Sequence, residues 1–431
     1  MRVIVYGDAK KLEDVAASGK MKIKERLRLI GASSAVVAAG ALERLAHDPN
    51  VEYVAPDLSV QPTAVGTPLS YPFLSTLYPQ IDGAPAAWGS GYTGAGIGVA
   101  VIDSGVVPAA DFGTRLVQVQ LNGQTSVTDT YGHGTFVAGV VGGASGDGRY
   151  VGIAPRASIY GINVNDSGGV FTSNVIFGLD WVDANRQAYN IRVVNISLSE
   201  TTASSYLSSP LDSAVERLWQ HGVVVVVSAG NLGPGTALYA PANDPFVITV
   251  GAVDSAGTLA TGDDRVASFS SSGTTQDGFA KPELLAPGRQ IPSILASTTT
   301  LGQQAPVANL LAPGYATMSG TSFAAPQVTG AAALVVQQHP EYTPDQIKWL
   351  LLQTSRSLSG SGRTLDIPAA LGYTGAVDAA NQGVPPASQP SASSDATLTS
   401  NTSSWNTSSW NTSSWNTSSW NTSSWNFSAW D

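Results

Sequence analysis

The stretch Val99-Ala-Val-Ile-Asp103-Ser-Gly105 is a short, continuously apolar run that ends in a carboxylate and a glycine turn. Such a run is typical of a strand that is buried on both faces, as in a parallel sheet. Polar side chains that follow these strands lie at the carboxyl edge of the sheet, where open α/β folds build their sites. Asp103 is therefore a candidate site residue, although an Asp considered alone at such a position more often caps the following turn.

Similar apolar runs alternate with helical patterns from Gly91 to about Leu371. The runs cover residues 97–102, 159–164, 192–198, 223–228 and 246–250. Between them, residues 175–182 place their apolar side chains on one helix face, residues 211–221 stop at Gly222, and Thr343-Pro344-Asp345 has the features of a helix start. This alternation predicts an α/β fold, a doubly wound and mostly parallel sheet flanked by helices.

Composition excludes several classes of protein. With 431 residues and 43% hydrophobic content, the chain can bury a full core. No run approaches the roughly 18 apolar residues of a spanning helix, so we expect no transmembrane segment. The net charge of −10 disfavours nucleic acid as a partner. Because cysteine is absent, neither a disulfide framework nor a thiolate metal site can form.

Two further motifs place a histidine and a serine at helix starts. Tyr131-Gly132-His133-Gly134-Thr135 leads into a helix-like apolar run, and Ser319-Gly320-Thr321-Ser322-Phe323 precedes a run of small residues. Imidazole titrates near neutrality, as a general base requires, and a serine hydroxyl needs such a base to become a nucleophile. Each motif alone also has an ordinary interpretation, as a surface histidine or a capping serine.

In this chain order, Asp103-Ser-Gly, Gly132-His-Gly-Thr and Gly320-Thr-Ser-Phe-Ala-Ala-Pro resemble the three signature motifs of the subtilase family, the subtilisin-like serine proteases. The resemblance covers roughly residues 70–371. It implies a subtilisin-like fold and a catalytic triad: Ser322 as nucleophile, His133 as general base and Asp103 as the acid that orients the histidine. The chain order Asp, His, Ser is that of the subtilisin triad.

The resemblance extends to the segments expected around the substrate. Val227-Ser228-Ala229-Gly230-Asn231 implies that Asn231 is a side-chain donor to the oxyanion, beside the Ser322 backbone N–H; the alternative is a purely structural asparagine. Asn195-Ile-Ser197-Leu198-Ser199 resembles the family strand that pairs with an extended substrate, which implies that Ser228, Ala229 and Gly230 form the opposite wall. Where many relatives have paired glycines after Ser-Leu, this chain has Ser199-Glu200, so the resemblance leaves its subsite preference open.

The amino-terminal part differs in charge from the rest. Residues 1–60 contain nine basic and eight acidic side chains, against 12 and 23 in the remainder. Strand-like segments at 3–5 and 51–54, a segment at 27–38 and a short helix near 42–46 predict a small α+β unit. Residues 41–57 resemble the subtilase propeptide, which implies an intramolecular inhibitor that assists folding. Residues 61–85, rich in Pro, Ser and Thr, are then the predicted linker with the maturation cleavage, and 86–375 the peptidase domain.

Low-complexity sequence is predicted for the tail, residues 376–431. After a Pro/Ser-rich stretch it repeats Asn-Thr-Ser-Ser-Trp from Trp405 to Trp425. A five-residue spacing produces no single aromatic face in a helix or a strand, so an amphipathic anchor is disfavoured. A solvated, disordered tail is the leading interpretation, and a sticky or carbohydrate-contacting segment is the second.

Together these observations predict a serine endopeptidase that hydrolyses peptide bonds in proteins through an acyl-enzyme intermediate and is made as a self-processing zymogen. The alternative is a catalytically silent subtilase-like scaffold with a binding tail. The expected partners are protein or peptide substrates and the chain's own propeptide, and we expect a monomer. Catalysis should need no cofactor; the resemblance is compatible with structural calcium, although no twelve-residue acidic loop occurs. It implies an extracellular or cell-surface location, although the sequence shows no signal peptide.

Overall fold

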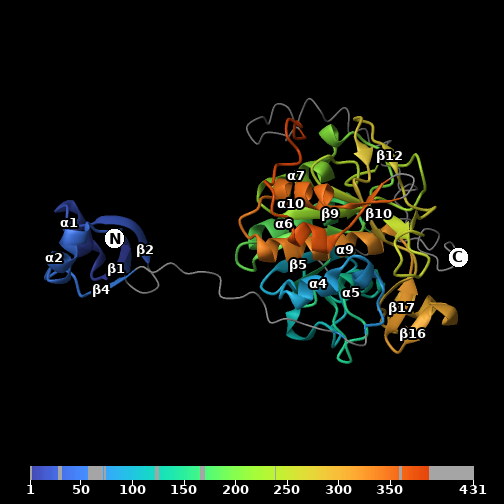
Figure 1. Cartoon of the computed structure of the whole chain (residues 1–431), viewed down its shortest axis with the longest axis horizontal. Helices are drawn as coiled ribbons and strands as arrows, with labels where there is room; N and C mark the ends of the chain where they lie inside the picture. The colour runs from blue at the N-terminus through green and yellow to red at the C-terminus, as the bar shows by residue number, and fades with distance from the viewer. Residues whose placement is uncertain are drawn as a thin grey trace. The chain divides into compact units, whose positions relative to one another are not determined.

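The structure is a computed structural model that describes residues 2–27, 32–56, 71, 74–121, 126–165, 170–237, 239–358 and 362–387. The chain divides into two compact units, residues 1–64 and 65–431, both drawn in Figure 1. Residues 61–70, 72 and 73 of the predicted linker and all of the Asn-Thr-Ser-Ser-Trp repeats lie outside the described residues. The predictions about the tryptophans therefore stay predictions.

The first unit is an antiparallel sheet of four strands in the order β2-β3-β1-β4, with two α-helices. The elements are β1 (Arg2–Tyr6), α1 (Ala9–Ala17), β2 (Lys22–Leu27), β3 (Ala32–Val36), η2 (Ala39–Ala41), α2 (Leu42–Ala46) and β4 (Tyr53–Pro56). Its small core includes Val3, Val5, Leu12 and Leu45. Strand β1 and helix α2 lie where the sequence predicts them. Helix α1 was missed because it buries only two of nine residues, and β2 because its segment is mostly charged.

The second unit contains a sheet of ten strands in the order β18-β19-β14-β10-β9-β8-β5-β7-β6, with β11 beside β10. All pairs from β19 to β6 are parallel, whereas β18 and β11 pair antiparallel. The strands are β5 (Gly98–Asp103), β6 (Leu116–Val119), β7 (Ser158–Asn163), β8 (Ile191–Ile196), β9 (Val224–Ser228), β10 (Ile248–Asp254), β11 (Arg265–Val266), β14 (Leu284–Pro287), β18 (Arg356–Ser357) and β19 (Arg363–Thr364). The predicted doubly wound, mostly parallel sheet is confirmed.

Helices cover both faces of this sheet (Figure 1). Helices α5 (His133–Gly142) and α9 (Thr321–Gln338) pack against each other on one face, and α6 (Thr172–Asn185) and α7 (Pro210–Gln220) lie together on the other. Helix α9 is buried from Thr321 to Val336 and is rich in small residues. A Cβ atom at Gly330 would lie 2.5 Å from Cβ of Ile153, so this close approach requires glycine. The small side chains therefore allow α9 to run through the core.

The remaining elements surround the sheet. They are α3 (Tyr78–Ile81), α4 (Ala84–Gly89), η3 (Gly113–Arg115), η4 (Tyr206–Ser208), β12 (Gly273–Thr274), β13 (Ala280–Lys281), β15 (Ile291–Ile294), α8 (Thr300–Gln304), η5 (Val307–Asn309), β16 (Leu310–Ala312), β17 (Tyr315–Met318), α10 (Pro344–Gln353) and α11 (Ile367–Leu371). Strands β15, β17 and β16 form a separate antiparallel sheet. The predicted start of α10 is confirmed, with Thr343 as its N-cap.

Two boundary predictions need correction. Residues 74–85, expected in the exposed linker, belong to the second unit: Tyr78 is 2% exposed and its hydroxyl donates to the Val151 carbonyl at 3.2 Å. Residues 376–387, expected in the tail, also pack on this unit. The Ala387 N–H donates to Glu216 Oε2 at 2.7 Å, and the Tyr206 hydroxyl donates to the Pro385 carbonyl. Composition alone did not reveal these partners, because they are distant in the chain.

Candidate active site

Asp103 is the last residue of β5, a strand that lies between β7 and β8 and is buried along its whole length. Its Oδ1 accepts a hydrogen bond from the Ser104 backbone N–H at 2.7 Å. Nδ1 of His133 lies 2.8 Å from Oδ1 and 2.9 Å from Oδ2. The carboxyl edge of the central sheet therefore holds a carboxylate directly against an imidazole, and both side chains are fully buried.

His133 is the first residue of α5, and the glycines beside it permit its position. Gly132 has φ +108°, a conformation that favours glycine. A Cβ atom at Gly134 would lie 2.2 Å from the Gly105 carbonyl oxygen, so any larger residue would push α5 away from β5. The Gly134 N–H donates to the Ser104 hydroxyl at 2.9 Å. The Gly-His-Gly sequence therefore allows the helix start to approach the Asp103 turn closely.

Asp129 fixes the same helix start, and the sequence analysis missed it. Its Oδ1 accepts hydrogen bonds from the Tyr131 and Gly132 N–H groups, and its Oδ2 accepts from the N–H and hydroxyl of Thr135, at 2.6–3.0 Å. Burial raises the pKa of this carboxyl, and the hydrogen bonds offset part of that rise. A carboxylate four residues before His133, at the start of a helix, was the available signal.

Ser322 is the second residue of α9 and is fully buried. Its Oγ donates to the Ser197 carbonyl at 3.4 Å, and its own carbonyl accepts from the Ser197 hydroxyl at 3.1 Å. The next residue, Phe323, packs with its ring centroid 5.5 Å from that of His133 and 4.6 Å from that of Phe136. The structure thus joins Asp103 and His133 directly and brings the Ser322 turn against the same histidine through Phe323.

Asn231 follows β9 and is bound to the residue before Ser322. Its Oδ1 accepts from the N–H of Thr321 at 2.9 Å and from the Thr321 hydroxyl at 3.0 Å. The Thr321 hydroxyl in turn accepts from the Gly230 N–H at 3.1 Å. Because both donors fix the amide oxygen, the two N–H bonds of the Asn231 side chain point away from Thr321. An amide held in this way suits a fixed donor beside the N-terminus of α9.

The two predicted substrate walls follow neighbouring strands. Ser197, Leu198 and Ser199 follow β8, whereas Ser228, Ala229 and Gly230 end and follow β9, and β8 and β9 pair in parallel. The two segments therefore leave the sheet at the same edge. The Ser197 hydroxyl accepts from Asn195 Nδ2 at 2.9 Å, and Asn195 Oδ1 accepts from the Thr329 hydroxyl of α9. This chain of hydrogen bonds ties the first wall to the helix that carries Ser322.

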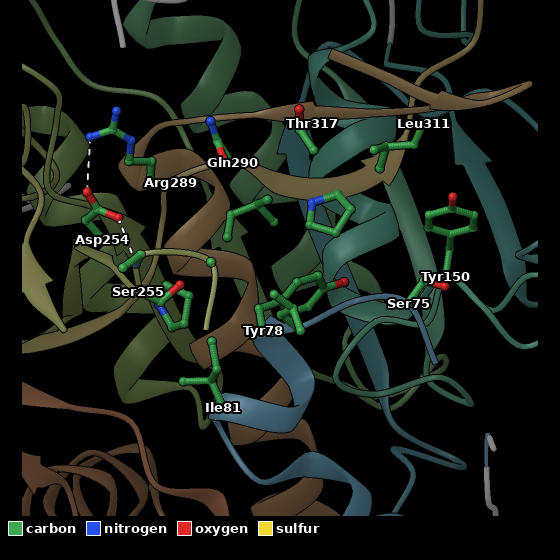
Figure 2. A pocket seen from close by; sticks show the side chains of 16 residues that line it. Ser75, Tyr78, Ile81, Tyr150, Asp254, Ser255, Arg289, Gln290, Leu311 and Thr317 are labelled. Atoms are coloured by element: carbon green, nitrogen blue, oxygen red, sulfur yellow. Dashed lines mark hydrogen bonds and ion pairs between the residues drawn. The ribbon is translucent and has the colours of Figure 1, made fainter. Parts of the chain in front are cut away.

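A groove of about 530 Å³ lies elsewhere on the second unit. Figure 2 shows its lining: the ion pair of Asp254 and Arg289, at 3.0 Å, is at one end, and Leu311 and Tyr150 are at the other. None of the predicted site residues lines it. At this groove the Gln290 N–H donates to the hydroxyl of Ser319, three residues before Ser322, at 3.0 Å. The candidate site is therefore identified by its residues and their contacts and not by the volume of a groove.

Among the residues that the structure describes, no group of three or more His, Cys, Asp or Glu side chains is arranged to hold a metal ion. A calcium site built from carbonyl oxygens stays a prediction. No described helix combines the length and the apolar character that crossing a bilayer requires.

Comparisons with known proteins identify the family of the chain. The family model described as "Subtilase family" matches residues 94–373. The chain is similar to Serine protease AprX of Bacillus subtilis (strain 168), with 39% identity over 274 residues that cover 61% of this chain and 62% of that protein, a little under two thirds of its length. It is also similar to Subtilisin E of the same organism, with 33% identity over 357 residues, 81% of this chain and 82% of the relative.

Among solved structures, the fold is similar to the crystal structure of a cold adapted subtilisin-like serine proteinase. The TM-score is 0.50 at 32% identity, and the match covers 64% of this chain and 89% of the other. Fold, order of motifs and relatives therefore lead to one conclusion: this chain belongs to the subtilase family.

Proposed function

We propose that the protein is a serine endopeptidase that cleaves peptide bonds in proteins through an acyl-enzyme intermediate. The subtilase relatives support a serine-type peptidase, a hydrolase. The observation that carries the finer proposal is the hydrogen-bonded pair of Asp103 and His133, packed through Phe323 against the turn of Ser322. Acid, base and nucleophile come from three elements that meet at one edge of the sheet.

The geometry supports a definite assignment of protons. Because Asp103 lies against Nδ1 of His133, the neutral imidazole carries its proton there, and Nε2 is the basic nitrogen. In the proposed first step Nε2 takes the proton of Ser322 while Oγ forms a bond to the substrate carbonyl carbon. The imidazolium then gives this proton to the leaving amine as the C–N bond breaks. In the second half of the reaction, His133 takes a proton from water while the water oxygen forms a bond to the acyl carbon. The bond to Ser322 Oγ then breaks, and Oγ takes the proton back from His133.

The negative oxygen of each tetrahedral intermediate needs fixed donors. The Ser322 N–H lies at the N-terminus of α9, where backbone donors have no intrahelical partner. We propose that the Asn231 side chain is the second donor, since its oxygen is already fixed by Thr321. Both donors are in place before the charge develops, which is the arrangement that lowers the barrier most.

The substrate is proposed to lie extended between residues 197–199 and 228–230. Main-chain hydrogen bonds to such walls provide affinity for any peptide, and side-chain pockets provide selectivity. Catalysis of this kind uses no cofactor, and the protein is proposed to act as a monomer.

The first unit is proposed to be a propeptide that is removed by self-processing. It forms a separate compact unit with its own sheet and core, as expected for a removable domain. The match to Subtilisin E is also longer than the region matched by the family model. An exported zymogen would act outside the cell, and we propose an extracellular or cell-surface location.

Hydrolysis of casein and of a peptide library tests the proposal, with mass spectrometry of the purified chain. The wild type should cleave both and lose its first 60 to 85 residues, and Ser322→Ala should do neither. Ser319→Ala, three residues earlier in the same turn, is the matched control and should keep the activity. If the wild type is inert even after residues 1–64 are removed, the endopeptidase proposal is wrong and a silent scaffold remains.

A further inference from the structure

We propose that Glu200 determines specificity by binding a basic side chain of the substrate, two to four residues from the scissile bond. The inference rests on the proposed endopeptidase function. Glu200 directly continues the proposed substrate wall of residues 197–199, and its backbone N–H donates to the Ala240 carbonyl at 2.8 Å. The backbone at Glu200 is therefore fixed at the end of that wall.

The distance along the wall sets the expected substrate position. Ser322 Oγ contacts the carbonyl of Ser197, so Ser197 is the wall residue at the nucleophile. Glu200 lies three residues further along. Because extended chains advance about 3.3 Å per residue, a substrate that follows the wall brings a side chain two to four residues from the scissile bond near Glu200.

The side chain of Glu200 is held beside this path. Its Oε1 accepts a hydrogen bond at 2.8 Å from the hydroxyl of Thr172, the first residue of α6. The residue is half-buried, and no described residue forms a hydrogen bond with its Oε2. One oxygen thus fixes the carboxyl group and the other is left to accept from a ligand.

The surroundings of Glu200 favour a cationic ligand. No ion pair joins Glu200 to a Lys, Arg or His in the part of the chain that the structure describes. Its electrostatic neighbour is another acid, Asp212, which in turn interacts with Asp244 and Glu216. Burial raises the pKa of the Glu200 carboxyl, and the bond from Thr172 offsets part of the rise. A partly desolvated carboxylate with no cation beside it is costly, and an ammonium or guanidinium group of a substrate would supply the counter-ion.

A positional-scanning peptide library tests the inference with the full chain. At one position, two to four residues from the cleaved bond, the wild type should cleave Arg or Lys peptides about tenfold faster than Ala peptides in kcat/KM, the ratio expected for one partly exposed charge pair. Glu200→Gln keeps an acceptor for Thr172 and should lose most of this ratio. Glu200→Lys should invert it in favour of acidic peptides, which a merely structural role would not do.

The pH dependence of cleavage provides a second test of the role of Glu200. The ratio of Arg to Ala cleavage should fall in the wild type as the pH drops and Glu200 is protonated, and it should be constant in Glu200→Gln. If the wild type cleaves the library but treats Arg and Ala alike at every position, or if Glu200→Lys keeps the wild-type ratio, the inference is wrong and the endopeptidase proposal stands. If the wild type cleaves neither library nor casein, both fail together.

Discussion

Two buried polar centres of the second unit differ in whether their carboxyl oxygens receive hydrogen-bond donors. At the candidate active site, both oxygens of Asp103 and both oxygens of Asp129 face N–H or O–H donors. The second centre, here called the acid cluster, consists of Asp212, Glu216 and Asp244 at α7 and the loop before β10. Both oxygens of Asp212, Oε1 of Glu216 and Oδ2 of Asp244 are buried without a hydrogen-bond partner within the described ranges.

The difference shows in the pKa values of the acid cluster. Burial, and then the charge of Asp244, raises the pKa of Glu216 to about 8. Burial raises the pKa of Asp244 to about 6 although Lys281 opposes the rise, and it raises the pKa of Asp212 well above the usual range. Carboxyl groups with one or both oxygens lacking a donor thus hold their proton to a higher pH, whereas both oxygens of Asp103 and of Asp129 receive donors.

A buried ammonium group fixes the loop beside the acid cluster. Lys348 of α10 is 3% exposed, and its Nζ donates to the carbonyls of Pro245 and Val247 and to Glu283 Oε1, at 2.6–2.9 Å. Burial alone would raise the pKa of Glu283, but Lys281 and Lys348 hold it below the usual value. These contacts of Lys348 hold α10 against the loop before β10.

The largest expected effect separates the two centres by activity. Asp103→Asn should lower kcat by about 10⁴-fold, because the amide no longer favours the imidazole tautomer with its proton on Nδ1. The similar change Glu216→Gln in the acid cluster should leave kcat at pH 7 within about twofold. Glu216 is mostly neutral at this pH and has no proposed part in catalysis. Peptide hydrolysis, with circular dichroism to verify folding, measures both. Equal losses of kcat in the two variants would show that the two centres do not differ in their role in catalysis.

The next effect concerns stability alone. Lys348→Met should lower the free energy of unfolding by about 3–5 kcal/mol, because Glu283 loses one of its two cations and buried carbonyls lose their donor. Urea unfolding in the Ser322→Ala background, which prevents self-digestion, measures it. The exposed Arg149→Met should change the free energy of unfolding by no more than about 0.5 kcal/mol. A Lys348 variant as stable as this control would contradict the assignment.

Asp129→Asn probes the hydrogen-bonded centre. The amide keeps one acceptor but directs N–H groups toward backbone donors, so the free energy of unfolding should fall by about 1–3 kcal/mol. Because α5 carries His133, kcat should fall while KM changes little. Thr135→Val removes one of the four bonds to Asp129, together with the acceptor of the Val107 N–H, but keeps the three backbone bonds to the carboxylate, so it should lower kcat less. Unchanged kcat and stability in Asp129→Asn would show that the four hydrogen bonds do not position the histidine.

The smallest effect is a pH dependence of stability in the acid cluster. The folded-state pKa of Glu216, about 8, lies above its unfolded value of 4.5. The contribution of this group is therefore full below pH 4.5 and is lost as the pH rises through 8. Glu216→Gln should match the parent near pH 5 and exceed its stability by about 1–3 kcal/mol at pH 9. Thermal unfolding of both, in the Ser322→Ala background, at several pH values is the measurement. A constant difference would contradict the raised pKa.

Much of the fold followed from local sequence. The apolar runs at 97–102 and 223–228 have no polar alternation, so they predict strands covered on both sides, and the central sheet confirms this. The Gly-His-Gly and Gly-Thr-Ser motifs predict that His133 and Ser322 lie at helix starts, and α5 begins at His133 and α9 at Thr321. The catalytic roles of these residues stay predictions, because the structure gives their positions and contacts but no reaction.

Features that depend on distant partners could not be predicted in this way. The burial of Tyr78 depends on Val151, the docking of Ala387 depends on Glu216, and the four bonds of Asp129 depend on a helix start that is known only once α5 is placed. Sequence alone determined the fold class, the family and the candidate triad, because these are written in periodicity and short motifs. Only the tertiary structure decided which buried carboxyls receive donors and which must keep a proton, because hydrogen-bond partners and desolvation arise from groups brought together by folding.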